Sequence, residues 1–213
     1  MSRSVVLDYD GTVTESDLLD RVAKEFGDPA IYQEVEDGLD EGLLPLRDVI
    51  IREFRPVTAP LDEVVDWVLE NAKVRPGFPD FVAEARAAGW ELLIVSSGFH
   101  ELIDPVLERE GVDVAVHANR VDPRADGWRV DWRYPGDCDE CGESCKRSLL
   151  PPGEVVYVGD GYSDRCAALA ADRVFATAGL ARYLAERGIP FEPFSDFNDL
   201  SRALANGIAT PPS

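Results

Sequence analysis

Acidic, hydroxyl and ammonium side chains follow the predicted strands of this chain, at positions where they could bind and react with a phosphate group. The apolar runs 4–7, 90–95 and 154–158 are typical of buried strands, and each ends in polar residues. Because the carboxyl ends of parallel strands meet at one edge of a sheet, we expect these polar groups to converge in a single pocket. The candidate residues are Asp8, Asp10, Ser96, Lys146, Asp160 and Asp164.

Four carboxylates in one pocket would repel one another unless a cation neutralised them. An oxygen-only ligand set favours Mg²⁺, which also accepts phosphate oxygens as ligands. Asp8 and Asp10 are two residues apart, so an extended backbone would point both toward the same face and Tyr9 toward the other. One carboxylate could then attack phosphorus while the other acts as general acid and base. Ser96 and Lys146, one of only three lysines, would hold the remaining phosphoryl oxygens.

The elements that must position these groups fall into two patterns. Residues 15–74 show helical spacing interrupted by Gly and Pro, which predicts a small all-helical insert. The rest alternates strand and helix, with a predicted hairpin around the turn at 123–127. We therefore predict an α/β fold, a three-layer Rossmann-like parallel-sheet core (1–14 and 75–213), with a helical cap (15–74) inserted after the first strand.

The same motifs, in the same order, resemble those of the haloacid dehalogenase (HAD) superfamily. They are Asp8-Tyr9-Asp10-Gly11-Thr12, Ser96, Lys146 and Gly159-Asp160-x-x-x-Asp164. The helical insert is similar to the cap of the phosphoserine-phosphatase-like branch. Three further segments resemble the branch that acts in methionine salvage on 2-hydroxy-3-keto-5-methylthiopentenyl-1-phosphate: 74–78, 95–99 and the cysteine loop that runs into Lys146.

This resemblance implies a role for each matching residue. Asp8 would be the nucleophile that becomes an aspartyl-phosphate, and Asp10 would protonate the leaving group and then activate water. Mg²⁺ would bind Asp8, Asp10 through its backbone carbonyl, and Asp160, while Asp164 would orient a metal-bound water or Lys146. Phosphate and substrate would contact Ser96, Ser97, Gly98, Lys146 and Asp17, with Arg47 a further candidate in the cap. The family often has Gly-Gly after the serine, where this chain has Ser97-Gly98.

Three cysteines are concentrated in one loop, as Cys138-x-x-Cys141-x-x-x-Cys145. They could hold a structural Zn²⁺, with Cys166, an aspartate or water as the fourth ligand. A single Cys-x-x-Cys pair is equally compatible with reduced, loop-packing thiols or with a reversible disulfide. The sequence leaves these three alternatives open.

Charge and composition restrict the class of partner. The net charge of −20 argues against nucleic acid and anionic membranes, because both require a cationic surface. With no long apolar run and no signal peptide, we expect a cytoplasmic location. The expected function is a Mg²⁺-dependent phosphomonoesterase acting on a small phosphorylated metabolite. Phosphoserine phosphatase, phosphotransferase and a silent phospho-ligand-binding regulator are the alternatives, and the oligomeric state stays open.

Overall fold

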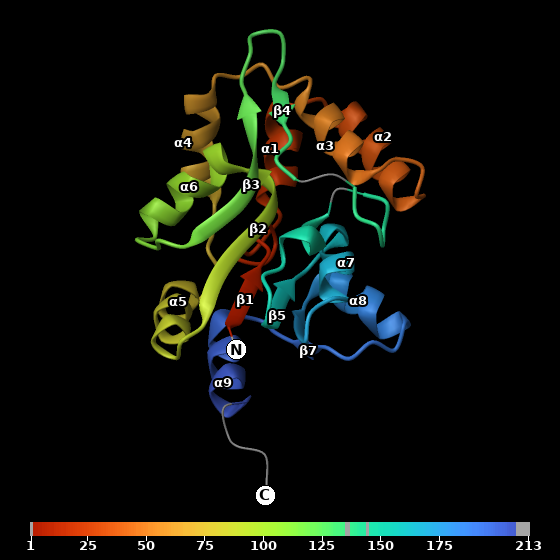
Figure 1. Ribbon diagram of the computed structural model, residues 1–213. Coiled ribbons are helices and arrows are strands. Elements are labelled where there is room, and N and C mark those ends of the chain that lie inside the picture. The colour runs from red at the N-terminus through yellow and green to blue at the C-terminus, as the bar shows by residue number, and fades with distance from the viewer. Residues whose placement is uncertain (1, 135–136, 144, 208–213) are drawn as a thin grey trace, which may run out of the picture.

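A seven-stranded sheet forms the centre of the part of the chain that the structure describes. The computed structural model describes residues 2–134, 137–143 and 145–207. Across the sheet the strands run in the order β4-β3-β2-β1-β5-β6-β7 (Figure 1). They are β1 (Arg3–Leu7), β2 (Glu91–Phe99), β3 (Ala115–Asp122), β4 (Arg129–Asp131), β5 (Glu154–Gly159), β6 (Arg173–Ala176) and β7 (Glu192–Pro193).

The strand pairs are parallel except at one edge. β1 lies between β2 and β5, and Leu7 is in register with Ile94 on one side and Val158 on the other. The last residues of three apolar strands therefore meet at one edge of the sheet, as predicted. β4 pairs antiparallel with β3, which confirms the predicted hairpin.

Helices cover both faces of the sheet. Val5 and Leu7 of β1 point to one face, and Val6 points to the other. The first face packs against α5 (Phe78–Ala87), α6 (His100–Arg109) and α9 (Phe197–Gly207). The second packs against α7 (Arg165–Ala168) and α8 (Ala178–Glu186). This arrangement confirms the predicted three-layer α/β core.

The predicted helical insert, here called the cap segment (15–74), contains four helices. They are α1 (Leu18–Phe26), α2 (Pro29–Asp40), α3 (Leu46–Phe54) and α4 (Leu61–Asn71). Asp17 and Asp28 cap α1 and α2 by accepting backbone N–H bonds, which explains where these helices begin. An isolated bridge between Thr14 and Val74 joins the two ends of the segment. The domain boundaries at 14/15 and 74/75 stay predictions.

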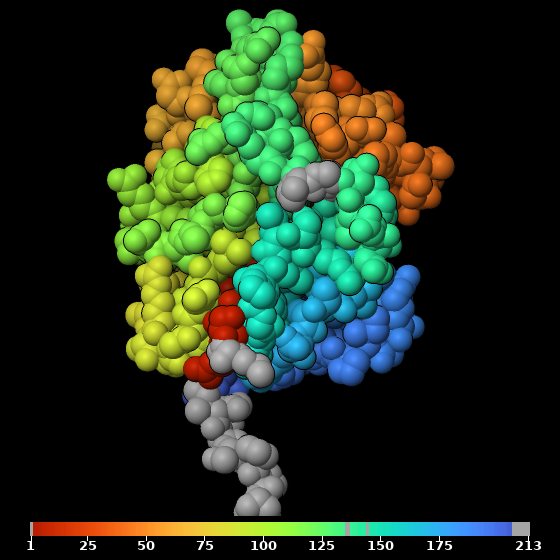
Figure 2. Space-filling view, viewed as in Figure 1, coloured from red at the N-terminus to blue at the C-terminus, as the bar shows by residue number. Residues whose placement is uncertain are grey.

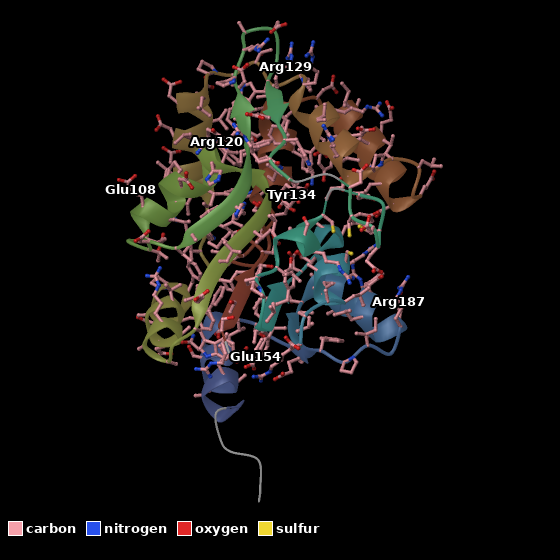
Figure 3. All side chains as sticks on the ribbon, in the orientation of Figure 1. Glu108, Arg120, Arg129, Tyr134, Glu154 and Arg187 are labelled. Carbon is pink, nitrogen blue, oxygen red and sulfur yellow. The ribbon has the colours of Figure 1, made fainter. Side chains whose placement is uncertain are left out.

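The β3–β4 hairpin rises from the sheet and packs against the cap segment, with α4 on one side and α2 and α3 on the other (Figure 1). Trp128 is 1% exposed and stacks on Phe54 of α3, with ring centroids 6.2 Å apart. Its indole N–H donates to the carbonyl of Ala59 at 3.0 Å, and its backbone N–H donates to Val57 at 2.9 Å. Arg129, labelled in Figure 3, follows it in β4. Backbone and side-chain bonds together therefore fasten the cap segment to the core.

The structure departs from the sequence-based expectations in three elements. β2 extends to Phe99, because a register irregularity between Val95 and Phe99 carries the strand past the predicted end. The helix predicted after β5 is divided into a 3₁₀ turn, η2 (Tyr162–Asp164), and the short α7. The two-residue β7 was not predicted, because it has no apolar run of its own.

Residues 135, 136 and 144 of the predicted cysteine loop, and residues 208–213 of the predicted core, lie outside the described residues. Within the described part of the chain, no helix combines the length and apolar character needed to cross a membrane.

Candidate active site

Side chains of Thr14 and Arg75 hold the loop that follows β1 by hydrogen bonds to its backbone. The hydroxyl of Thr14 donates to the carbonyl of Tyr9 and accepts from the N–H of Gly11. Arg75 donates to the carbonyls of Gly11 at 2.7 Å and Thr12 at 2.9 Å. This clamp holds the turn that carries Asp8 and Asp10 at the edge of the sheet.

Asp8, Lys146 and Asp164 form a charged network that is almost completely removed from water. The three residues are 4%, 1% and 0% exposed. The Lys146 ammonium donates to Asp8 Oδ1 and to Asp164 Oδ1, the second at 2.7 Å. Asp164 also accepts from the Tyr157 hydroxyl at 2.7 Å and from the backbone N–H groups of Asp160 and Gly161, both at 2.9 Å. Four bonds occupy the acceptor sites of Asp164 and connect it to Lys146, Tyr157 and the loop after β5.

Burial is the main influence on the pKa values in this network. Removal from water raises the pKa of Asp8, and the charge of Asp164 raises it further, while Lys146 opposes both. For Lys146, burial lowers the pKa, but the adjacent Asp164 and Asp8 carboxylates outweigh this and raise it overall. The lysine therefore stays an ammonium and provides the fixed positive charge of the site.

Asp10 lies beside this network and is connected to the cap segment. Its Oδ1 accepts the backbone N–H of Leu19, in the first turn of α1, at 3.1 Å. Its Oδ2 accepts from the Ser96 hydroxyl at 3.3 Å. Burial raises the pKa of Asp10 to about 6, against the lowering effect of the Leu19 bond. A carboxyl group that titrates near neutrality is suited to both giving and taking a proton.

Asp160 approaches the first loop closely because residue 11 is a glycine. A Cβ on Gly11 would lie 2.4 Å from Asp160 Oδ2, and Gly11 has φ +74°, which disfavours other residues. Thr12 donates its hydroxyl to Asp160 Oδ1 at 3.2 Å. Burial raises the pKa of Asp160 to about 6, and the Asp164 charge adds to the effect. Carboxylate oxygens of Asp8, Asp160 and Asp164 lie within 4.8 Å of one another.

Most of the predicted polar residues line a cavity of about 190 Å³ between the core and the cap segment. From the core come Asp8, Asp10, Ser97, Gly98 and Asp160. Ser96 is fully buried behind it, and its hydroxyl accepts the Gly98 N–H at 2.9 Å. The cap side combines apolar and acidic residues, namely Asp17, Leu19, Asp20, Glu36, Leu39, Leu46, Val49, Ile50 and Glu53.

Three of the cap residues form a second carboxylate cluster. Oxygens of Asp20, Glu36 and Glu53 lie within 4.8 Å of one another. Burial, followed by the charges of Glu36 and Asp20, raises the pKa of Glu53 to about 8. Burial likewise raises the pKa of Glu36 to about 6. These residues received no role from the sequence, because nothing in their spacing across α1, α2 and α3 indicates that they meet.

Two cap residues singled out from the sequence lie in different places. Asp17 lines the cavity and caps α1, where its Oδ1 accepts the Asp20 N–H at 2.8 Å. Arg47 is exposed and does not line the cavity; its guanidinium lies 5.7 Å from the centre of the Trp132 ring. The structure therefore does not bring Arg47 to the site.

Several supporting residues were missed by sequence reasoning. The hydroxyl of Tyr134, near the centre of Figure 3, donates to the carbonyl of Ser96 at 2.6 Å. Asn119, fully buried, donates to the carbonyl of Ser97 at 2.8 Å and accepts the Arg133 N–H at 2.9 Å. Both hold the irregular last part of β2 from the β3–β4 side. A buried Asn within an apolar strand is the only sequence signal that could have indicated this role.

Buried aspartates and a lysine lie under a helical cap, at the carboxyl edge of a parallel sheet, where open α/β folds place their ligands. The family model of haloacid dehalogenase-like hydrolases matches residues 5–169. The chain belongs to this family, which confirms the resemblance found in its motifs and its assignment as a hydrolase.

Relatives and solved structures agree with this assignment. A protein of Geobacillus thermodenitrificans named 2-hydroxy-3-keto-5-methylthiopentenyl-1-phosphate phosphatase is 31% identical, over 94% of this chain and 95% of the relative. A protein of the same name from Exiguobacterium sibiricum is 28% identical, over 94% and 95%. A phosphoserine phosphatase from T. onnurineus shares the fold with a TM-score of 0.70 at 20% identity, covering 97% and 96% of the two chains.

Proposed function

We propose that this protein is a Mg²⁺-dependent phosphomonoesterase that works through an aspartyl-phosphate, with 2-hydroxy-3-keto-5-methylthiopentenyl-1-phosphate as its substrate. The observation that carries the proposal is the buried Asp8–Lys146–Asp164 network, with Asp10 and Asp160 beside it at the same sheet edge. A structural role alone does not account for so many charges in one place, since burying them is costly.

The donor set fits Mg²⁺. Asp8 and Asp160 present carboxylate oxygens to the same point, and Gly11 leaves the space that a side chain would otherwise fill. Asp8, Asp160 and the backbone carbonyl of Asp10 would hold the ion, whereas the oxygens of Asp164 are already engaged by Lys146, Tyr157 and backbone N–H groups. When bound, Mg²⁺ would offset the negative charge of the phosphoryl oxygens.

The chain's own residues supply the remaining chemistry. A carboxylate oxygen of Asp8 attacks phosphorus as the bond to the leaving oxygen breaks, and Asp10 gives that oxygen its proton. Asp10 then takes a proton from water, which attacks phosphorus, breaks the bond to Asp8 and releases inorganic phosphate. Lys146 and the end of β2 around Ser96 stabilise the charge that spreads over the phosphoryl oxygens.

The cap side of the cavity supports a substrate without a carboxylate. None of the described residues that line it is an Arg or a Lys, and Asp20, Glu36 and Glu53 would repel the carboxylate of phosphoserine. Leu39, Leu46, Val49 and Ile50 offer apolar surface on which a methylthio group could pack. The names of the curated relatives support the same substrate.

Released phosphate from a substrate panel tests this proposal. The panel contains the methylthiopentenyl phosphate, phosphoserine, a phosphorylated amine and a generic aryl phosphate, each with and without Mg²⁺. We expect the first to have the highest kcat/KM. Faster hydrolysis of the phosphorylated amine would instead assign the acidic cluster to an ammonium group. No hydrolysis of any member would contradict the enzyme and favour a silent phospho-ligand-binding protein.

Asp8→Asn tests whether the released phosphate comes from this protein and not from a contaminating phosphatase. The amide cannot attack phosphorus, so we expect kcat to fall by about a thousandfold or more. The matched control is Asp113→Asn, which changes an exposed carboxylate between α6 and β3 and should leave kcat unchanged. If D8N retains more than a tenth of the parent activity, Asp8 is not the nucleophile.

A further inference from the structure

All four cysteines of the chain meet at one place beside the active-site cleft. Cys138, Cys141 and Cys145 come from the loop before the 3₁₀ turn η1 (Lys146–Leu149), and Cys166 comes from α7. Their sulfur atoms all lie within 4.8 Å of one another, and the Cys138 and Cys166 sulfurs are 3.9 Å apart. In Figure 3 the yellow sulfur atoms gather where this loop approaches α7. All four are free thiols rather than disulfides.

The spacing of these sulfurs matches a tetrahedral metal centre. With metal–sulfur bonds of about 2.3 Å, the sulfurs of a tetrahedral zinc site lie about 3.8 Å apart. Four thiolates without an oxygen ligand select zinc over Mg²⁺ or Ca²⁺. We propose that Cys138, Cys141, Cys145 and Cys166 together bind one structural Zn²⁺. Of the three alternatives left open by the sequence, this one accounts for the convergence of Cys166 with the loop.

The local backbone already has the shape that such a site requires. The Gly142 N–H donates to the Cys138 carbonyl at 2.8 Å, and the Cys138 N–H donates to Glu143 at 2.8 Å. Gly142 has φ +72°, so the chain can reverse immediately after Cys141. This compact turn brings the Cys138 and Cys141 sulfurs to the same side, as a metal-binding knuckle does.

The surrounding charges favour a negatively charged centre. Four thiolates and Zn²⁺ carry a net charge of about −2. Arg147 and Arg165 line the same cavity, of about 320 Å³, as Cys141, Cys145 and Cys166. The buried Nε of Arg165 has no hydrogen-bond partner among the described residues, although its guanidinium lies 4.4 Å from the centre of the Tyr162 ring. Glu140 and Glu143 line this cavity too, and Arg147 lies 3.8 Å from Glu140, so Arg165, which has no ion pair among the described residues, would offset this charge.

The site would connect two segments that supply the catalytic network. Cys145 directly precedes Lys146, and Cys166 follows Asp164 by two residues. Glu143, two residues before Cys145, connects this loop to both neighbouring segments. Its carboxylate accepts from the Leu46 N–H of the cap segment at 3.3 Å and from the Tyr162 hydroxyl at 3.2 Å. In Figure 2 the loop lies between the orange cap helices and the blue C-terminal part of the core. A zinc ion here would fix the loop that delivers Lys146, without contacting the substrate.

Metal content of the full chain, purified without chelator, tests the proposal. We expect about one zinc per chain, retained in excess Mg²⁺, and we expect Cys166→Ser and Cys141→Ser to lower it at least about fivefold. Glu140→Gln, a change in the same loop that removes no thiol, should keep the zinc. The result does not depend on the proposed phosphatase activity, because zinc and not turnover is measured.

Replacement by Co²⁺ gives a second measurement that needs no variant. A four-thiolate site should produce intense sulfur-to-cobalt charge-transfer absorption and the visible bands of tetrahedral cobalt. Less than about a tenth of an equivalent of zinc, with no such absorption, would overturn the proposal. So would recovery of two disulfides, or zinc content unchanged by both cysteine variants. Circular dichroism of each variant shows whether a loss of zinc reflects a lost ligand or a lost fold.

Discussion

Two clusters of carboxylates face the same cleft, and they manage repulsion in different ways. In the core, Asp8 and Asp164 share the buried ammonium of Lys146, and backbone N–H groups occupy the rest of Asp164. In the cap segment, Asp20, Glu36 and Glu53 also lie together, but the cation nearest to them, Lys24, is half exposed and 3.6 Å from Asp20. The first cluster is paired with a buried cation, whereas in the second burial raises the pKa values of Glu36 and Glu53 to about 6 and about 8.

The difference indicates what each cluster is built to do. In the proposed mechanism Asp8 must be ionised when it attacks, and the Lys146 ammonium places a positive charge beside it. A surface that meets the leaving group of a substrate has no such requirement. The pKa of Glu53, raised by burial to about 8, therefore fits a residue that need not be ionised. Four changes test this contrast.

Lys146→Met should have the largest effect, because it removes the fixed charge of the core cluster. Asp8 and Asp164 would be left buried without their shared cation, which costs about 3 kcal/mol of unfolding free energy. We expect kcat to fall about a hundredfold or more, since the phosphoryl group loses its ammonium donor. Chemical denaturation and released phosphate measure the two effects, and Lys73→Met, an exposed lysine, is the control.

Adding Asp164→Asn to Lys146→Met sharpens the result. Removing the second buried charge should restore about 1 kcal/mol or more of stability, whereas activity should stay low. Strictly additive losses of stability in the double variant would mean that Lys146 and Asp164 are not energetically coupled.

Glu53→Gln probes the cap cluster through pH. The pKa of Glu53 is raised from 4.5 to about 8, so the folded state holds its proton more tightly than the unfolded state. Its contribution to stability is complete below about pH 4.5 and is lost as the pH rises toward 8. We expect Glu53→Gln to gain about 3 kcal/mol relative to the parent between pH 5 and pH 8.

Thermal or urea unfolding at these two pH values measures the gain. Glu63→Gln, an exposed change on α4, should show no pH-dependent difference from the parent. An equal effect of E53Q at both pH values would mean that Glu53 is ionised in the folded protein, like the carboxylates of the core.

Trp128→Phe should have the smallest effect, because it loosens the attachment between the two clusters without changing either. It removes the bond to Ala59 and part of the stacking on Phe54, at a cost of about 1 kcal/mol. Trp132→Phe is a matched control, since the Trp132 Nε1 is buried with no partner in the described part of the chain. We expect W128F to raise KM more than it lowers kcat, as measured by steady-state kinetics. If W128F and W132F have the same KM and kcat, the Ala59 bond does not hold the cap segment.

Much of the core could be predicted because its signals are local. The apolar run before Asp8 and the β-α alternation after residue 75 were sufficient for the fold class and for the convergence of the motifs. Strand ends were less certain, because the irregularity that extends β2 to Phe99 depends on its pairing with β3. The roles assigned to the individual site residues stay predictions.

The sequence by itself determined which groups would meet at the carboxyl edge of the sheet, since β-α alternation implies parallel strands whose carboxyl ends share one edge. Only the tertiary structure decided what surrounds them. Asp20, Glu36 and Glu53 come from three helices, and Cys166 joins its partners from another segment of the chain, so their proximity depends on packing angles. The same is true of Tyr134 and Asn119, whose bonds to the carbonyls of Ser96 and Ser97 in β2 join segments far apart in the chain. Contacts between distant segments leave no periodic trace along a chain, and a single sequence does not reveal them.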